Sequence, residues 1–196
     1  MHMAKGKKPH PRKTETTMKE SASLILDPYL YLGPCSAASS SFVSSVGITH
    51  ILSIGSTPTT HFPNVVYERI PLIDSPTSSL LHAANRAAIF LDSVEAAGGK
   101  VLVHCSAAIS RSPAVVAAYL VIRKRMSLKQ ALGRILQTRP STSPNRGFMV
   151  QLNEIELEHL GALSLGLDEL PRRKEERLAL FVDVAENNGG TALALC

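Results

Sequence analysis

The sequence has few of the features that would indicate a disulfide framework, a zinc site or a membrane protein. It has no Trp and only three cysteines, Cys35, Cys105 and Cys196, none of them in a CxxC-type pair. This spacing argues against a disulfide scaffold and a cysteine-based zinc site, and it favours a reducing compartment. Apolar runs stay well short of the roughly 18 residues of a membrane span, and no signal peptide is apparent. We therefore predict a cytoplasmic protein without stable membrane insertion.

Positive charge is concentrated near the N-terminus. The formal net charge is +5, and residues 1–22 hold six Lys or Arg against two Glu. Because this segment is polar and lacks hydrophobic periodicity, we predict a disordered, solvated basic tail and no nucleic-acid partner. The same tail is compatible with a nuclear address, so a nuclear location is a second prediction.

Beyond the tail, strand and helix patterns alternate. Gly47 marks the end of the first helical pattern, and Ser127 is placed as the N-cap of a later one. The alternation predicts an α/β domain over residues 23–163, whose central mixed sheet of about five strands is flanked by helices. The predicted strands are 24–26, 29–32, 49–54, 64–70 and 101–104, and the predicted helices are 37–46, 80–97, 112–125, 127–138 and 144–163. Residues 164–196 are predicted to be a C-terminal extension, helical over 167–184 and then flexible.

A loop of small residues joins the last predicted strand to a largely apolar helix. Cys105 stands at its start, and Arg111 follows six positions later. The first N–H groups of a helix have no internal partners, and a loop above them aims further N–H groups inward, which makes a site of phosphate size. Pro113 suits such a helix start, and the planar fork of Arg111 matches two phosphate oxygens. The same field favours a thiolate at Cys105, which is then a nucleophile at neutral pH.

A buried cysteine at a strand end is more often a small core hydrophobe than a nucleophile. Here the neighbouring His104 and the hydroxyls of Ser110 and Ser112 favour the anion site. The spacing to Arg111 favours it as well, because an arginine at the edge of a buried helix needs an anion partner.

The segment HCSAAISRS, residues 104–112, resembles the signature loop of the cysteine-dependent protein phosphatases. The order of the surrounding motifs is similar to that of the small, atypical dual-specificity branch of the protein tyrosine phosphatase superfamily. The matching pieces are LYLGPCSAAS, GITHILSI, IPLIDSP, VLVHC and RPSTSPNRGFMVQL, within residues 24–158. The resemblance implies a protein tyrosine phosphatase-like fold, with residues 23–163 as the catalytic domain.

The resemblance also implies a two-step hydrolysis of a phosphate ester. Cys105 would attack phosphorus to form a cysteinyl-phosphate, and Arg111 would bind the equatorial oxygens. Asp74 would protonate the leaving group and later activate water. Ser112 would hydrogen-bond the thiolate, and His104 would orient the loop from below.

Further residues are implied to bind phosphate or to support the loop. Asn145 would pin the loop through its amide, with helix N-capping as an equal alternative. Asp74 is alternatively a turn former, and Ser112 is alternatively only a cap. The implied phosphate-binding residues are Ser106, Ala107, Ala108, Ile109, Ser110 and Arg111.

Ala108 departs from the family pattern, which usually has glycine there. A loop that points successive N–H groups inward often needs a left-handed residue, and alanine in that conformation costs roughly 1–2 kcal/mol. One alternative function is therefore a catalytically impaired pseudophosphatase that binds phosphoproteins as a scaffold. A sulfurtransferase is another, although its cysteine loops are usually shorter and lack the PNxGF element.

The loop interior, residues 106–110, carries no Lys or Arg. Polyphosphorylated lipids or RNA triphosphate ends require additional cations, so the predicted partner is a phosphorylated protein. A compact domain without long insertions favours a shallow site that accepts phosphoserine, phosphothreonine and phosphotyrosine. Neither a cofactor nor a metal is implied. The sequence specifies neither the oligomeric state nor whether Cys35 pairs with Cys105 under oxidation.

Overall fold

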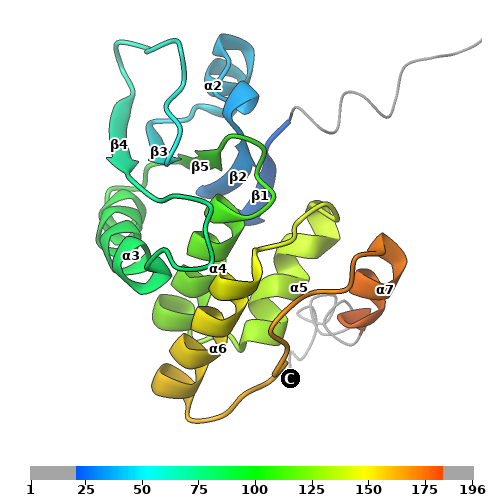
Figure 1. Cartoon of the computed structure of the whole chain (residues 1–196). Coiled ribbons are helices and arrows are strands. Elements are labelled where there is room, and N and C mark those ends of the chain that lie inside the picture. The colour runs from blue at the N-terminus through cyan, green and yellow to red at the C-terminus, as the bar shows by residue number, and fades with distance from the viewer. Residues whose placement is uncertain (1–20, 183–196) are drawn as a thin grey trace, which may run out of the picture.

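The computed structural model describes residues 21–182. Within them, five strands form one sheet in the order β1-β2-β5-β3-β4 (Figure 1). β1 pairs antiparallel with β2, whereas β2, β5, β3 and β4 are mutually parallel, so the sheet is mixed as predicted. The strands are β1 (Ser23–Leu26), β2 (Leu30–Pro34), β3 (His50–Ile54), β4 (Val66–Ile70) and β5 (Val101–Cys105).

β5 is the central strand, and all of its residues are buried. Its aliphatic start is typical of a parallel strand that is covered on both faces. Cys105, its last residue, lies beside Pro34 of β2, and His104 lies beside Ser53 of β3. Because parallel strands end on the same edge of a sheet, the segments that follow β3, β4 and β5 meet near Cys105.

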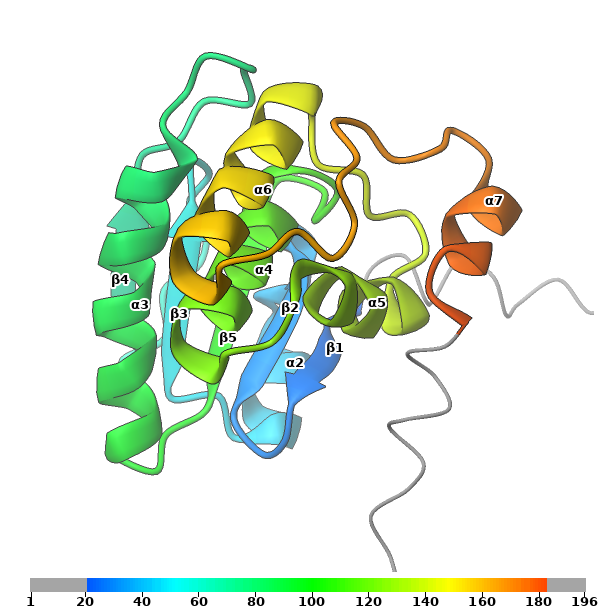
Figure 2. The same ribbon diagram turned by 90° about the horizontal axis from the view of Figure 1, so that it is seen from below.

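Helices cover both faces of the sheet. On one face, α4 contacts α3, α5 and α6, whereas η1 and α2 lie on the other face (Figures 1 and 2). The helices are η1 (Cys35–Ala37), α2 (Ser40–Val46), α3 (Leu80–Ala96), α4 (Arg111–Lys124), α5 (Leu128–Thr138), α6 (Arg146–Leu160) and α7 (Lys174–Ala179). Among residues 21–182, no helix has the length and apolar character needed to cross a bilayer.

Capping residues set the helix boundaries. Gly47 ends α2 in the left-handed conformation, and Ser127 caps α5, as the sequence indicates. The predicted helix 37–46 is too long, because Ser39 caps α2 and the preceding turn is a separate 3-10 helix. The predicted helix 144–163 is shortened to α6, because Asn145 caps its start and Gly161 adopts a left-handed conformation at its end.

The predicted helix 167–184 is wrong over most of its described length. Over residues 167–181, helical structure is confined to α7, and residues 183–196 lie outside the described residues, as does the predicted tail apart from Ser21 and Ala22. Arg177 of α7 is buried and donates to main-chain carbonyls of Pro140, Pro171 and Arg172, which stabilises an irregular path before the helix.

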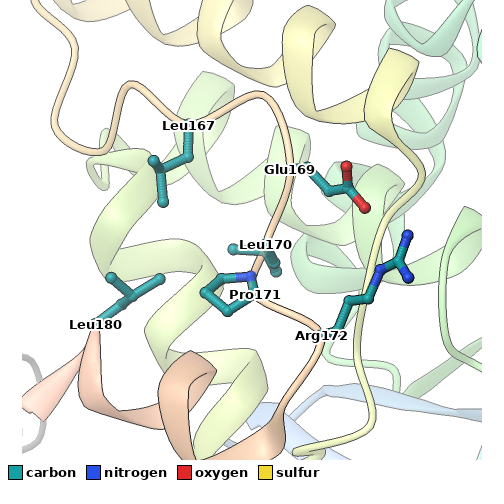
Figure 3. A pocket seen from close by; sticks show the side chains of 6 residues that line it. All are labelled: Leu167, Glu169, Leu170, Pro171, Arg172 and Leu180. Atoms are coloured by element: carbon teal, nitrogen blue, oxygen red, sulfur yellow. The ribbon is translucent and has the colours of Figure 1, made fainter.

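The extension packs on the rest of the domain, since Leu170 and Phe181 belong to the main apolar core. An open groove of about 460 Å³ lies along it (Figure 3). The groove is lined by Leu167, Glu169, Leu170, Pro171, Arg172 and Leu180, none of which belongs to the loop after β5.

His104 of β5 is fully buried, and its Nε2 lies 2.8 Å from Ser53 Oγ of β3. Burial lowers the pKa of His104 to about 4. The ring is therefore neutral at pH 7, and it links β3 to β5 directly before Cys105.

We predict that His104 makes the domain less stable as the pH falls from 6.5 to 4. The unfolded chain takes up the proton first, because folding lowers the pKa of His104 from 6.5 to about 4. The contribution of the neutral ring is complete above pH 6.5, and about 3 kcal/mol of it is lost as the pH falls to 4. Urea unfolding across this range measures the loss, which His104→Asn is expected to remove. An exposed-histidine variant, His82→Asn, is the control, and equal pH dependence in His104→Asn and wild type contradicts the assignment.

Candidate active site

The loop between β5 and α4 surrounds the buried sulfur of Cys105. Ser112, in the first turn of α4, donates from Oγ to Cys105 Sγ at 3.2 Å. The first N–H groups of α4 face the same region, because Arg111 is its first residue and Pro113 needs no N–H partner there. A thiolate at this position is therefore stabilised by a hydroxyl donor and by the positive end of a helix.

Ala108 is the residue at which this loop turns. Its φ is +54°, which is the left-handed conformation, and it is fully buried. The loop therefore keeps the turn that a glycine would make, at a conformational cost of roughly 1–2 kcal/mol. Ala107 and Ile109, the residues on either side of Ala108, are exposed to solvent.

Asp74, in the segment after β4, is tied to the loop by hydrogen bonds. Its Oδ1 accepts from Ser110 Oγ at 2.7 Å and from Asn145 Nδ2 at 2.8 Å. Its Oδ2 makes neither of these bonds and lies 3.9 Å from Arg111 Nε. The side chain is 43% exposed, so this carboxylate contacts both the loop and solvent.

The amide of Asn145 does not contact the loop as predicted. Its Nδ2 donates to Asp74, whereas its Oδ1 caps α6 by accepting from Phe148 N–H at 3.0 Å. The loop is held instead by main-chain groups: Asn145 N–H donates to Ser110 Oγ at 3.1 Å, and Ser143 N–H donates to the Ile109 carbonyl at 2.8 Å. Asn145 thus serves both as the helix cap and as a support for the carboxylate.

Gly147 makes the approach of the Asp74 segment to α6 possible. A Cβ at this position would lie 2.0 Å from the carbonyl oxygen of Pro76, far inside contact distance. Gly147 belongs to the PNxGF element of the sequence, but no role was predicted for it. Its position directly after Asn145 and Arg146, at the start of a helix, is the signal that marks it, because glycine is unfavourable inside helices unless space is needed.

Arg111 lies against the segment after β3. Its Nη2 donates to Ser106 Oγ at 2.9 Å, and Ser106 Oγ lies 2.7 Å from Ser56 Oγ. A Cβ on Gly55, which has a φ of +77°, would lie 2.5 Å from Arg111 Nη1. The contacts of Gly55 and Ser56 were not predicted, because they join residues 50 or more positions apart and leave no local signal in the sequence.

Cys35 borders the same loop. Its N–H donates to the Ser106 carbonyl at 3.2 Å, and its Sγ contacts the Thr57 carbonyl at 3.5 Å. Burial raises the pKa of the Cys35 thiol, and the charge of Cys105 raises it further. Both Cys35 and Cys105 are free thiols in this structure.

These groups combine a nucleophile, an arginine fork and a carboxylate at one edge of the sheet. Main-chain N–H groups and hydroxyls supply the remaining donors, and Arg111 donates a hydrogen bond to Ser106 Oγ of the loop. Among residues 21–182, no three His, Cys, Asp or Glu side chains gather as potential metal ligands. The arrangement is suited to nucleophilic attack on a tetrahedral oxyanion, with a carboxyl group beside the leaving group.

Comparisons with known proteins place this loop in a family. A model described as the dual specificity phosphatase catalytic domain matches residues 30–158. Human dual specificity protein phosphatase 5 is 42% identical over 135 residues, which cover 68% of this chain and 35% of that protein. Dual specificity protein phosphatase 1 of Arabidopsis thaliana is 36% identical over 143 residues, which cover 72% of each protein.

The solved structure of human DUSP28 is similar with a TM-score of 0.66 and 31% identity, over 72% of this chain and 95% of that one. The chain spans 35% to 42% of the length of the first curated relatives that it matches. The family model, by contrast, covers β2 to α6, including both Cys105 and Asp74. The chain therefore belongs to the family of dual specificity phosphatase catalytic domains.

Proposed function

We propose that this chain is a protein phosphatase that hydrolyses phosphoserine, phosphothreonine and phosphotyrosine monoesters through a cysteinyl-phosphate. The observation that carries the proposal is the arrangement around Cys105. Its Sγ accepts a hydrogen bond from Ser112 at the start of α4, and the carboxylate of Asp74 is bonded to the same loop. Membership of the dual specificity phosphatase family supports the same activity.

In the first step, the Cys105 thiolate attacks phosphorus, and the bond between phosphorus and the ester oxygen breaks. Arg111 and the N–H groups of residues 106–111 bind the remaining phosphoryl oxygens. Asp74 gives its proton to the leaving oxygen, since an alkoxide leaves poorly without one. Because Oδ1 already accepts two hydrogen bonds, Oδ2 is the oxygen that we assign to this transfer.

In the second step, water attacks phosphorus, and the sulfur–phosphorus bond breaks. Asp74, now ionised, accepts a proton from the water. Ser112 donates its hydrogen bond to the departing thiolate of Cys105, which stabilises the charge that develops on sulfur. His104 takes no part in proton transfer, because it is buried behind the loop and bonded to Ser53.

A monophosphate on a protein is the substrate class that best fits the site. The loop itself supplies no Lys or Arg before Arg111, so the charge of one phosphoryl group is matched without excess. Ile73, 75% exposed beside Asp74, and Ile109, 41% exposed on the loop, offer apolar surface for the substrate side chain. Such surface tolerates both alkyl and aryl side chains.

Binding of phosphoprotein without turnover is the less favoured alternative. Cys105, Arg111 and Asp74 are all present, and Ala108 adopts the left-handed conformation that the turn requires. A cytoplasmic or nuclear location stays a prediction, and the need for a reduced thiol at Cys105 supports it.

We expect Cys105→Ser to abolish phosphate release from an aryl phosphate, because an alcohol at this position is a poor nucleophile at neutral pH.

Asp74→Asn is expected to lower kcat by roughly 10²- to 10⁴-fold on a phosphothreonine peptide, whose leaving alkoxide needs a proton. The loss is expected to be smaller on an aryl phosphate with an acidic phenol. Asp92→Asn, on the surface of α3, is the control. An unchanged rate for Asp74→Asn on the phosphothreonine peptide means that Asp74 is not the general acid.

We expect Ala108→Gly to change both stability and turnover only slightly. Glycine relieves roughly 1–2 kcal/mol of left-handed strain, but it forfeits about 0.8 kcal/mol of methyl burial and about 0.4–1 kcal/mol of unfolded-state entropy. Ala107→Gly relieves no such strain, so it is the matched control and is expected to destabilise. The test compares urea unfolding and aryl phosphate hydrolysis. An inactive wild type that Ala108→Gly restores to activity refutes the proposal of an active enzyme.

A further inference from the structure

Arg111 is held in place before any phosphate arrives. Its side chain is only 17% exposed, and its Nη2 donates to Ser106 Oγ at 2.9 Å. Its Nε is buried without a hydrogen-bond partner and lies 3.9 Å from Asp74 Oδ2. The direct hydrogen bond to Ser106 is therefore what orients the guanidinium, and anything that orients Ser106 acts on Arg111 as well.

Ser106 is oriented by a residue outside the phosphate loop. Its Oγ lies 2.7 Å from Ser56 Oγ, across 50 residues of sequence. Ser56 follows β3, whose end lies beside β5 at the edge of the sheet where Cys105 is found (Figure 1). A continuous chain of hydrogen bonds thus runs from Ser56 through Ser106 to Arg111.

Ser56 is itself fixed by the strand next to it. The preceding residue, Gly55, donates its N–H to the Ile70 carbonyl at 2.9 Å and accepts from Arg69 Nη2 at 3.5 Å, so β4 holds it from two sides. Gly55 has a positive φ and no Cβ. A Cβ at this position would lie 2.5 Å from Arg111 Nη1, so the glycine leaves room for the guanidinium. The Gly55-Ser56 pair therefore forms a wall against which Arg111 rests.

We propose that Ser56 is a positioning residue for the phosphate-binding Arg111 and acts through the hydroxyl of Ser106. The proposal rests on the proposed function, in which Arg111 binds the phosphoryl oxygens. A long side chain that is ordered beforehand loses less entropy when the anion binds. The two hydroxyls are neutral, so they order the guanidinium without competing for its charge as a carboxylate would.

The test measures binding of inorganic phosphate by calorimetry in a Cys105→Ser background, where no turnover interferes. Ser56→Ala is expected to weaken phosphate binding by about 2- to 12-fold, the range for ordering one flexible side chain. Ser56→Thr keeps the hydroxyl and is expected to restore binding. In the catalytically active chain, Ser56→Ala is expected to raise KM for an aryl phosphate more than it lowers kcat.

A double-mutant cycle separates positioning from a general structural effect. In a Ser106→Ala background, Ser56→Ala is expected to have no further effect, because the connection to Arg111 is already broken. Ser41→Ala removes a comparable exposed hydroxyl pair with Ser39 and is the matched control. Unchanged phosphate binding in Ser56→Ala, or an equal loss with and without Ser106, overturns the proposal. Absent turnover in the wild type with these binding effects intact would refute the proposed function but not the positioning role.

Discussion

The tight turn between Cys105 and the N-terminus of α4 is the constraint on which the rest of the site depends. Five residues must reverse the chain while their N–H groups point inward, and Ala108 accomplishes this with a φ of +54°. The left-handed conformation is unfavourable for alanine, so contacts with neighbouring residues must stabilise the loop. They do so from outside the loop, through Ser143 to the Ile109 carbonyl and through Asp74 to Ser110.

The parallel sheet explains why these supports come from distant parts of the chain. β3, β4 and β5 all end at one edge, so the segments carrying Ser56, Asp74 and Cys105 converge without long connections. The segment between α5 and α6 lies at the same edge, because α6 packs on α4. Gly147 then permits the closest approach, between α6 and the Asp74 segment. The catalytic geometry is a consequence of strand order, as is usual for ligand sites at the carboxyl ends of parallel strands.

Neutral and charged side chains occupy different parts of the site. His104, which lies behind the loop, is uncharged, since burial keeps it neutral at pH 7. Hydroxyls surround the reacting groups, with Ser112 on the sulfur and Ser106 on the guanidinium of Arg111. Asp74 and Arg111 carry charges beside the loop, 3.9 Å apart, and the buried guanidinium of Arg139 is a further cation that interacts with Cys105. The direct hydrogen bond that orients Arg111 thus comes from a neutral hydroxyl, whereas the Asp74 carboxylate lies farther away, at ion-pair distance.

The sequence by itself determined the fold class, the succession of strands and helices along the chain, and the loop that begins at Cys105. Local periodicity and capping residues such as Gly47 and Ser127 encode these features. The sequence also indicated the left-handed turn at Ala108. Only the tertiary structure decided that the Asn145 amide binds Asp74, that Gly55 makes room for Arg111 and that Ser56 reaches Ser106. These contacts join residues 50 or more positions apart or depend on space left by a missing Cβ, and neither property leaves a periodic signal in the sequence.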